Sequence, residues 1–492
     1  MKKTFLLSCL MLAAMPVMAA YTGHVYVDKN KNGVFDQSEK PLAGIKVSDG
    51  LIVVETAADG SFTLPGHERE RFIFITTPSG YKTFNRHYHK IEKKQSGYDF
   101  GLIPYSGRIR KNGSHRYIHI ADTEIFNTEN HADWVNNVRD YARNEQAAFI
   151  IHTGDICYEK GLKAHIKLMN TENMDCPVFY CFGNHDLVKG KYGEELFESI
   201  YGPVYYSFDA GNVHYVVTPM PGGDHAPGYT SDDVCRWLKN DLAHIRPGTP
   251  VVVFNHDLLT YEDTFIFKSK NAGSINLNEY NLKAWVYGHW HINYMKKQGD
   301  VYSVCTSSLD KGGIDHSTTA FRVMHVDSKG DFTSELRYTY LDKNICIASP
   351  AGVMASGVLP VAVNVYSSVS PVREVLYTCL ADGKPVLKNK RLLQSTDWSW
   401  NGELPLSHKY VGKELTLRVT ARFNNGEIAE AESHFICRTE KAVPLFSADW
   451  DNLSGNAKHS APVSAPLNLP LQLAWTNNVG DNLFMTSPLK HK

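Results

Sequence analysis

Five short segments of this 492-residue chain carry side chains that can bind metal ions, and each ends or follows an apolar run of strand length. The side chains are carboxylates, one amide, imidazoles and a tyrosine, which offer oxygen and nitrogen donors. Such donors suit zinc, manganese or iron and do not suit copper(I). The segments are residues 120–124, 152–158, 182–186, 253–256 and 288–291.

The placement of these segments at strand ends predicts that their side chains meet at one site. Strands deliver the loops at their ends to one edge of a sheet, so five such loops can converge. His289 and His291 are two residues apart in an extended segment, so they face the same way and can each reach one of two metals. Two metals about 3.5–4 Å apart that share a carboxylate can clamp the attacking and leaving oxygens of a phosphoryl group.

Strands and helices must alternate along the chain to position these loops. Helical spacing of apolar residues predicts helices over 130–143 and 236–242. Together with the apolar runs, this alternation indicates an α/β domain with buried sheets. The runs predicted to be strands are residues 117–121, 148–153, 178–182 and 251–255.

The motif series resembles the calcineurin-like metallophosphoesterases. It reads Asp, Gly-Asp, Gly-Asn-His-Asp, His and Gly-His-x-His, and the resemblance covers about residues 115–340. The resemblance implies a four-layer α/β/β/α sandwich with two metals at its edge. It assigns Asp122 and His291 to one metal, Asp155 to a bridge, Asn184, His256 and His289 to the other metal, His185 to the general acid and Asp186 to its orienting partner.

Two residues depart from the family pattern. The family often has histidine two residues after the first aspartate, where this chain has Glu124. Tyr158 matches the Gly-Asp-x-x-Tyr of purple acid phosphatases, in which the tyrosine binds iron(III). The first metal is therefore expected to be held by Glu124, by Tyr158 or by both. The alternative for Tyr158 is a packed aromatic at the rim of the site.

These residues predict a metal-dependent phosphoesterase. Attack of hydroxide held by two metal ions, drawn from Mn, Zn, Fe or Mg, would cleave phosphate mono- or diesters. The expected substrate is a small-molecule or glycan-linked phosphate ester. A non-catalytic cell-surface or periplasmic binding protein that keeps a metal site is one alternative. A nucleotide or pyrophosphate hydrolase is another, and it differs only in substrate.

Residues 28–39 fit the twelve-residue calcium loop, with Gly33 at the sixth position. Their pattern also resembles calcium-binding β-sandwich repeats of bacterial surface proteins. A structural calcium ion is therefore expected, and a solvated turn is the alternative. The donors would be Asp28, Asn30, Asn32, the carbonyl of Val34, Asp36 and Glu39.

The first residues resemble a signal peptide. Lys2 and Lys3 precede an apolar run, and small residues follow near Ala20. We therefore expect an exported protein that is periplasmic, attached to the cell surface or secreted, with no transmembrane segment after signal removal; an uncleaved anchor is the alternative. Cys379 and Cys437 lie in two candidate strands, and we consider both a disulfide and two buried free thiols.

The length predicts several domains. Short strands separated by turn residues predict an N-terminal β-sandwich and a C-terminal immunoglobulin-like β-sandwich that flank the α/β domain. The formal net charge of −1, without a long run of like charge, gives no nucleic-acid-binding signature. The predicted divisions are 1–20 (signal peptide), 21–104 (N-terminal sandwich), 105–345 (metallophosphoesterase domain), 346–438 (C-terminal sandwich) and 439–492 (a tail that resembles the start of a β-propeller repeat).

Overall fold

The computed structural model describes residues 20–439 except residues 68, 69, 94, 96 and 342. The predicted signal peptide and the predicted tail therefore fall almost wholly outside the described residues. The chain forms two compact units, which divide between Tyr340 and Leu341. None of the helices in the described part of the chain is both long and apolar enough to cross a membrane.

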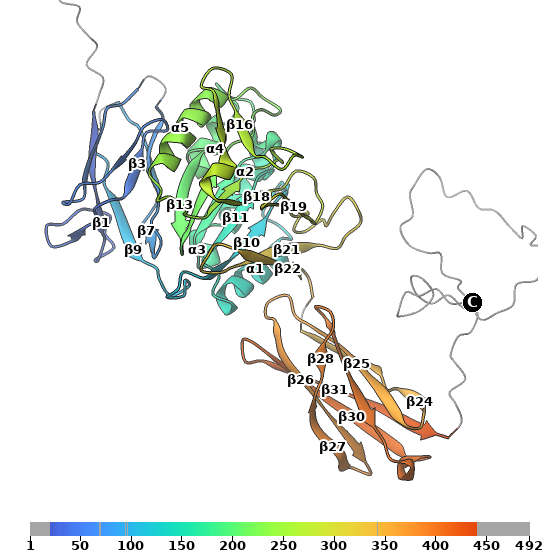
Figure 1. The fold of residues 1–492 in the computed structure, drawn as a ribbon. Coiled ribbons are helices and arrows are strands. Elements are labelled where there is room, and N and C mark those ends of the chain that lie inside the picture. Colours follow the sequence, from blue (N-terminus) through green and yellow to red (C-terminus); the bar gives the residue numbers. More distant parts are fainter. Residues whose placement is uncertain (1–19, 68–69, 94, 96, 342, 440–492) are drawn as a thin grey trace, which may run out of the picture. The chain divides into compact units, whose positions relative to one another are not determined.

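The N-terminal domain is the predicted β-sandwich (Figure 1). One sheet has the order β2-β1-β9-β7, with β5 also paired to β1, and the other has the order β4-β3-β6-β8. Alternate apolar side chains of both sheets, including Val25, Ile73 and Phe100, meet in a buried core. The strands are β1 (Tyr21–Val27), β2 (Lys40–Pro41), β3 (Lys46–Ser48), β4 (Val53–Glu55), β5 (Ser61–Leu64), β6 (Phe72–Ile75), β7 (Tyr81–Thr83), β8 (Tyr88–Lys90) and β9 (Phe100–Pro104).

The central domain contains two facing sheets. In the first sheet the order is β12-β11-β10-β21-β22, and β10, β11 and β12 are parallel. In the second the order is β13-β14-β15-β18-β20-β19, and β14, β15, β18 and β20 are parallel. The first sheet has β10 (His115–Ile120), β11 (Phe149–Thr153), β12 (Val178–Cys181), β21 (Ala320–Val326) and β22 (Phe332–Tyr338). The second has β13 (Tyr206–Ala210), β14 (Val213–Val217), β15 (Val251–Phe254), β18 (Leu282–Tyr287), β19 (Tyr294–Gln298) and β20 (Val301–Cys305), and β16 (Ile266–Lys268) pairs with β17 (Ser274–Asn276) nearby.

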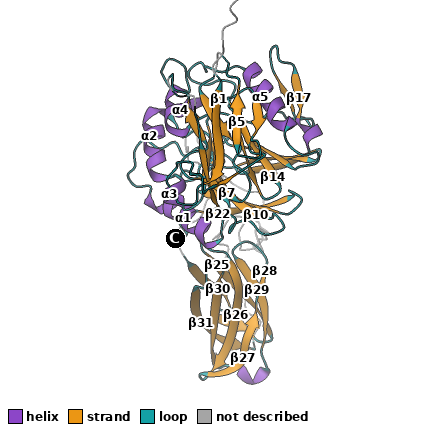
Figure 2. Ribbon diagram, turned by 90° about the vertical axis from the view of Figure 1, so that its left-hand side faces the viewer, coloured by secondary structure: helices purple, strands orange, loops and turns teal. Residues whose placement is uncertain are grey.

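Helices cover the outer faces of the two sheets, as Figure 2 shows. Trp134 and Leu162 pack with Ile118 of β10 in one buried core, whereas Tyr117 of β10 faces the second sheet. Trp237 packs on the far side of the second sheet, where Phe74 of the N-terminal domain joins it. The predicted four layers are therefore present. The fourth layer is formed by the helix that carries Trp237 together with the N-terminal sandwich. The helices are α1 (Ala132–Asn144), α2 (Tyr158–Leu168), α3 (Thr171–Met174), α4 (Glu195–Tyr201) and α5 (Ser231–Ala243), with short 3-10 turns η1 (Asn184–Asp186) and η2 (Leu277–Tyr280).

Polar contacts also join the N-terminal domain to the central domain. Arg71 donates to Glu194 at 2.7 Å and to Glu198 at 2.9 Å, and both carboxylates are buried. Thr76 and Ser207 are bonded through their hydroxyls at 2.8 Å. Because each contact pairs a buried polar group, the two domains are held in one arrangement.

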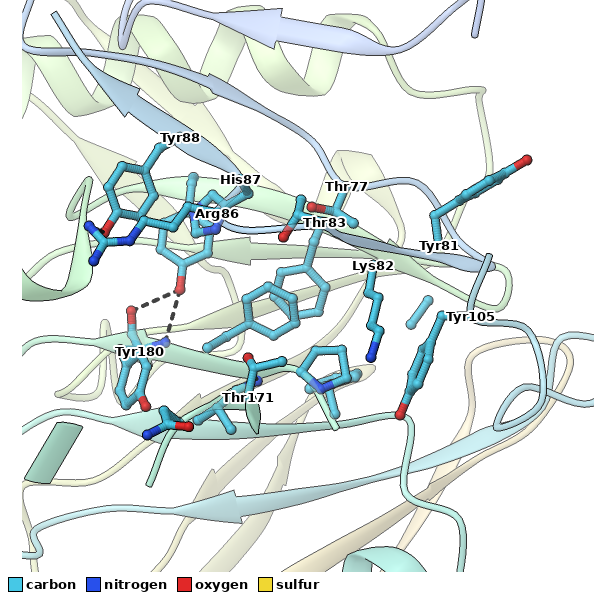
Figure 3. A pocket seen from close by; sticks show the side chains of 18 of the residues that line it. Thr77, Tyr81, Lys82, Thr83, Arg86, His87, Tyr88, Tyr105, Thr171 and Tyr180 are labelled. Atoms are coloured by element: carbon cyan, nitrogen blue, oxygen red, sulfur yellow. Dashed lines mark hydrogen bonds between the residues drawn. The ribbon is translucent and has the colours of Figure 1, made fainter. Parts of the chain in front are cut away.

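A cavity of about 400 Å³ lies along this contact, at the end of β11 and β12 opposite the predicted metal loops (Figure 3). Lys82 and Tyr105 line one side of the cavity, and Tyr180 and Tyr206 line another. The hydroxyl of Tyr206 is bonded to the backbone of Tyr180. The cavity shows that the two domains contact each other on both sides of a gap, without continuous packing.

The second unit is a β-sandwich, as predicted. Its sheets have the orders β23-β25-β29-β28 and β24-β31-β30-β26-β27, and a single apolar core lies between them. The predicted border after residue 345 falls inside β23, so the division lies a few residues earlier. The elements are β23 (Asn344–Ser349), β24 (Gly352–Ala355), β25 (Val358–Tyr366), β26 (Val372–Ala381), β27 (Lys384–Arg391), β28 (Leu393–Gln394), β29 (Ser399–Pro405), η3 (His408–Tyr410), β30 (Glu414–Phe423) and β31 (Ile428–Arg438).

The disulfide hypothesis for this unit does not hold in the structure. Cys379 and Cys437 are both free and buried. Cys379 lies on β26 and Cys437 on β31, and β30 lies between these strands in the same sheet. Strands separated by a third strand are roughly 9–10 Å apart, which exceeds the reach of a disulfide.

Protonation of a buried histidine at the base of the second sheet should make stability depend on pH. His214 lies 2.7 Å from a carboxylate oxygen of Asp209 and 2.8 Å from one of Asp241. Burial opposes its charge, but the two carboxylates outweigh burial and raise its pKa to about 9. An unfolded histidine has a pKa of about 6.5. The stabilisation is therefore complete below about pH 6.5 and is lost as pH rises through 9.

We expect the free energy of unfolding of the wild type to exceed that of His214→Gln by on the order of 3 kcal/mol near pH 6. The difference should shrink steadily above pH 6.5. Urea denaturation of both proteins from pH 6 to pH 10 measures it. A difference that stays constant across this range would contradict the raised pKa.

Candidate metal centre

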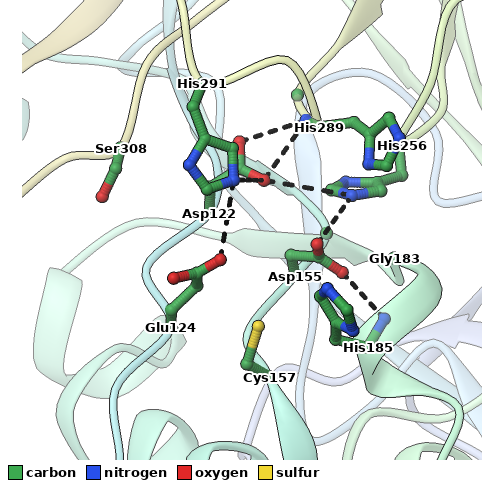
Figure 4. Close-up of polar contacts among 12 residues, drawn as sticks. Asp122, Glu124, Asp155, Cys157, Gly183, His185, His256, His289, His291 and Ser308 are labelled. Carbon is green, nitrogen blue, oxygen red and sulfur yellow. Dashed lines mark hydrogen bonds and ion pairs between the residues drawn. The ribbon is translucent and has the colours of Figure 1, made fainter. Parts of the chain in front are cut away.

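The five predicted segments meet at one edge of the central sheets (Figure 4). They meet because the strands before them run parallel within each sheet, so that their carboxyl ends share an edge. The ligand candidates are Asp122 after β10, Asp155 after β11, Asn184 after β12, His256 after β15, and His289 with His291 after β18.

Distances between donor atoms are those of a common site. His256 Nε2 lies 3.1 Å from Asp155 Oδ2 and 3.9 Å from Asp122 Oδ1. His291 Nε2 lies 3.4 Å from Asp122 Oδ1. Donor atoms of Asp155, His256 and His289 all lie within 4.8 Å of one another. Aspartates and imidazoles from four of the five loops therefore surround one small volume.

Burial makes this cluster unfavourable without a cation. Asp122 is fully buried and Asp155 is 1% exposed, and burial raises the pKa of Asp122. Burial opposes a charge on His256 too, but the neighbouring carboxylates outweigh it and raise its pKa to about 9. The surroundings thus favour positive charge between the carboxylates, which metal ions supply.

Two buried donor atoms indicate where such a cation would bind. Asn184 Oδ1 and His256 Nε2 are both buried and have no hydrogen-bond partner among the described residues. A buried polar atom without a partner costs about 1–3 kcal/mol. His256 Nδ1 lies 2.7 Å from the carbonyl of Thr153, so it donates there, and Nε2 can bind a metal ion in place of its proton. The residues present therefore fit a metal centre.

The backbone at this site is held in an unusual conformation. Besides Tyr158 (57°), five of the candidate residues have positive φ, a region that costs a non-glycine residue about 1 kcal/mol or more. Strain of this kind persists where the surroundings fix the chain. Here the strained backbone turns successive side chains toward the candidate metal centre. The residues and angles are Asp122 (51°), Glu124 (44°), Asp155 (53°), His289 (65°) and His291 (50°).

Glycines let the loops approach one another. A Cβ atom on Gly183 would lie 2.1 Å from Asp155 Oδ1, and one on Gly288 would lie 2.8 Å from Asp122 Oδ2. Both distances are too short for any side chain. Glycine is thus required in the Gly-Asn-His-Asp and Gly-His-x-His motifs, because Gly183 lies against the carboxylate of Asp155 and Gly288 lies against that of Asp122.

The first departure from the family pattern, Glu124, does lie at the site. Its Oε1 is 3.5 Å from His291 Nε2, and its Oε2 accepts from Lys311 at 2.8 Å. Donor atoms of Glu124, Asp155 and Cys157 form a second group within 4.8 Å, so Asp155 belongs to both groups. Cys157 was not among the predicted ligands, and burial raises the pKa of its thiol.

The second departure, Tyr158, lies at the rim. Its side chain is 44% exposed, and its ring centroid lies 5.3 Å from that of His185 and 6.5 Å from that of Phe126. This is the arrangement of the rim aromatic that sequence analysis gave as the alternative. Coordination of a metal by its hydroxyl stays a prediction.

The candidate general acid has a different partner from the one expected. His185 Nδ1 lies 2.8 Å from Asp224 Oδ2, while its backbone N–H donates to Asp155 at 3.0 Å. Burial lowers the pKa of His185, but Asp224 outweighs it and raises the pKa. Asp224 lies 39 residues along the chain, and the only sequence signal for it is the pair of glycines that precede it.

The prediction that Asp186 orients His185 is therefore corrected. Asp186 is fully buried and accepts from the backbone N–H of Cys157 at 2.7 Å and from that of Gly183 at 2.8 Å. It joins the two loops that follow β11 and β12, and so it acts on the position of Asp155 and Asn184 through the backbone.

Neighbouring residues hold the loop that carries Asp224. The backbone N–H of Asp224 donates to the carbonyl of Asn184 at 3.0 Å. Farther along the loop, the N–H of Gly228 donates to Glu194 at 2.9 Å, the same carboxylate that pairs with Arg71. The N-terminal domain is thus connected to the loop beside the candidate acid through one buried glutamate.

The predicted calcium loop closes on itself. Asp28 accepts from the backbone of Asn32 and Gly33 at 3.2 and 2.9 Å. Glu39, the twelfth residue, folds back to accept from the backbone of Lys29 at 2.8 Å. These hydrogen bonds close the loop, and the side chain of Val34 is exposed, so that only its carbonyl would take part in binding calcium.

Comparison with known proteins agrees with this geometry. The family described as "N terminal of Calcineurin-like phosphoesterase" matches residues 29–104, and that described as "Calcineurin-like phosphoesterase" matches residues 115–293. Purple acid phosphatase 13 of Arabidopsis thaliana is 26% identical over 215 residues, which cover 41% of this chain. The chain spans 36% of the length of that relative.

Solved structures show only slight overall likeness. A conserved protein of Streptococcus pneumoniae TIGR4, described as a predicted phosphoesterase, is 11% identical with a TM-score of 0.22 over 46% of this chain and 98% of that one. A chimeric titin Z1Z2 tandem is 14% identical with a TM-score of 0.14 over 30% of this chain and 75% of that one. Neither likeness bears on the fold.

The two matched segments stand in family order, and the second contains all six residues assigned to the metals. The chain therefore belongs to the calcineurin-like metallophosphoesterases, with the N-terminal domain of that family and a distant similarity to a purple acid phosphatase.

Proposed function

We propose that this protein hydrolyses phosphoric esters at a dinuclear metal centre. The observation that carries the proposal is the cluster of two buried aspartates, the buried His256 and the half-buried His289 and His291. Two donor atoms at the site lack a hydrogen-bond partner among the described residues. Asp155 supports a bridging role because it belongs to two donor groups, one with His256 and His289 and one with Glu124. Two bound cations of the Mn, Zn, Fe or Mg class would neutralise phosphoryl oxygens and lower the pKa of water.

The protein itself supplies the proton for the leaving group. Asp224 accepts from Nδ1 of His185, which leaves Nε2–H free to donate to the departing ester oxygen. His185 is about one-third exposed, so a substrate can reach it. Its hydrogen bond to Asp155 is made by the backbone N–H, so that bond leaves Nε2 of the ring available for catalysis.

The pairing of His185 with Asp224 favours an enzyme over the alternative of a non-catalytic binding protein. A site that only bound metal would need the donors on Asp122, Asp155 and the histidines. It would not need a histidine whose ring is paired with an aspartate outside the donor set. The nucleotide or pyrophosphate hydrolase alternative concerns only the substrate and stays a prediction.

Removing the shared carboxylate should abolish activity. Asp155→Asn keeps the shape of the side chain but removes the charge that joins both donor groups. We expect turnover to fall by about 10²- to 10³-fold or more, together with a loss of bound metal. Elemental analysis and assays with p-nitrophenyl phosphate and bis(p-nitrophenyl) phosphate measure both effects.

A matched control separates this effect from loss of folding. Asp241 is as deeply buried as Asp155 but pairs with His214, away from the site. Asp241→Asn should retain the metal content of the wild type. Near-normal turnover by Asp155→Asn would refute the assignment.

The role of Asp224 can be tested with esters that differ in leaving group. A p-nitrophenolate leaves without a proton, whereas an alkoxide requires one. For Asp224→Asn we therefore expect about 10²-fold lower turnover of an alkyl phosphate and a much smaller loss with p-nitrophenyl phosphate. His185→Asn should show the same pattern. Equal losses on both esters would show that Asp224 does not act through proton donation.

We also propose that residues 28–39 bind calcium, supported by the spacing of the donors and the closed loop. Millimolar calcium should raise the melting temperature of the wild type by a few degrees, because a ligand that binds only the folded state stabilises it. Asp28→Ala should lose this rise and Asp155→Asn should keep it. The reverse pattern, measured by calorimetry, would place the calcium at the metal centre.

We propose export of the protein on the basis of the first twenty residues. Cleavage after the small residues near Ala20 would leave a mature chain that begins near Tyr21. The mass of the protein isolated from the host cell decides between this form and an uncleaved chain.

A further inference from the structure

Two exposed aromatic rings stand beside the candidate acid. Phe126 is 57% exposed and Tyr158 is 44% exposed. Their rings lie 12° from parallel with centroids 6.5 Å apart, and the ring of Tyr158 lies 5.3 Å from that of His185. The three rings thus form a row, in which the ring of Tyr158 is next to both of the others. Grouped apolar side chains that face water commonly mark a binding surface.

The backbone that carries these rings is fixed. Ile125, directly before Phe126, is 2% exposed in the core between the first sheet and its helices. Gly161 of α2 packs so closely on this segment that a Cβ atom there would lie 2.5 Å from the carbonyl of Ile125. Tyr158 begins the same helix. Both rings are therefore presented by rigid segments, which lowers the entropy lost when a ligand binds.

Hydrolysis fixes the side on which the leaving group lies. The oxygen of water bonds to phosphorus as the water gives up a proton to solvent, and the P–O bond of the ester breaks. The departing oxygen takes a proton from Nε2 of His185, which solvent then replaces. The alcohol part of the ester must therefore lie against His185. The next surface along the row is the ring of Tyr158, followed by that of Phe126.

We infer that Phe126 and Tyr158 form a leaving-group subsite for phosphoric esters of alcohols that carry a flat aromatic or heteroaromatic ring. The inference rests on the proposed function. Stacking on aromatic side chains accepts many planar rings, because it depends on the face of the ring and not on its substituents. Phe126 and Tyr158 determine substrate preference, and the metal centre determines the reaction.

The ring preference can be measured with benzyl phosphate and ethyl phosphate, whose alcohols have similar acidity. On the metal-loaded full chain, we expect kcat/KM for the benzyl ester to exceed that for the ethyl ester by about tenfold. Phe126→Ala should reduce this ratio by about fivefold. Trp398→Ala removes an aromatic of the C-terminal unit that is 43% exposed, close to Tyr158 at 44%, and should leave the ratio unchanged.

Tyr158→Phe separates the subsite from the alternative that the tyrosine binds metal. The variant keeps the ring and removes only the hydroxyl, so the benzyl-to-ethyl ratio and the metal content should both persist. Loss of metal in this variant would assign Tyr158 to the metal and overturn its place in the subsite.

A binding measurement keeps the inference distinct from the proposed function. Calorimetry with benzylphosphonate and ethylphosphonate reports ring recognition without turnover. If the wild type hydrolyses neither ester, the proposed function fails, while a preference for benzylphosphonate that Phe126→Ala removes still supports the subsite. Equal binding of the two phosphonates by the wild type, or an unchanged preference in Phe126→Ala, would overturn the subsite even in an active enzyme.

Discussion

The structure depends on the burial of carboxylates that need a cation. Asp122 and Asp155 lie in the interior, and the partners of these two carboxylates among the described residues are imidazoles and backbone amides. Buried charges are unfavourable unless they are paired, so these surroundings favour a cation between the two carboxylates. The positive φ angles and the glycines at Gly183 and Gly288 follow from the same need, because the loops must bring these oxygens close together.

The layers around the site serve this arrangement. Parallel strands in both central sheets direct their carboxyl ends to one edge, and the apolar cores on both faces keep that edge in place. The N-terminal sandwich contributes as well. Its Arg71 pairs with Glu194, which in turn holds the loop that carries Asp224. A domain outside the catalytic fold is thus connected to the residue that orients the candidate acid.

Much of the site could be predicted from sequence because its residues stand at the ends of apolar strands. The position of Asp122 after one strand and Asp155 after the next is enough to bring them together. Asp224 could not be found in this way, because a polar loop has no periodicity that fixes where its side chains point. Asp186 was misassigned for a related reason: adjacency to His185 in sequence suggested contact with its ring, but the carboxylate turns to the backbone of Cys157 and Gly183. The N-terminal sandwich forms part of the fourth layer through contacts between domains. Local sequence patterns do not encode such contacts.

The most direct test is a crystal structure of the purified protein with anomalous diffraction at the absorption edges of its bound metals. The account predicts two anomalous peaks about 3.5–4 Å apart, one on either side of Asp155, with Asn184, His256 and His289 around one and Asp122 and His291 around the other. A single peak, or peaks away from these side chains, would contradict it.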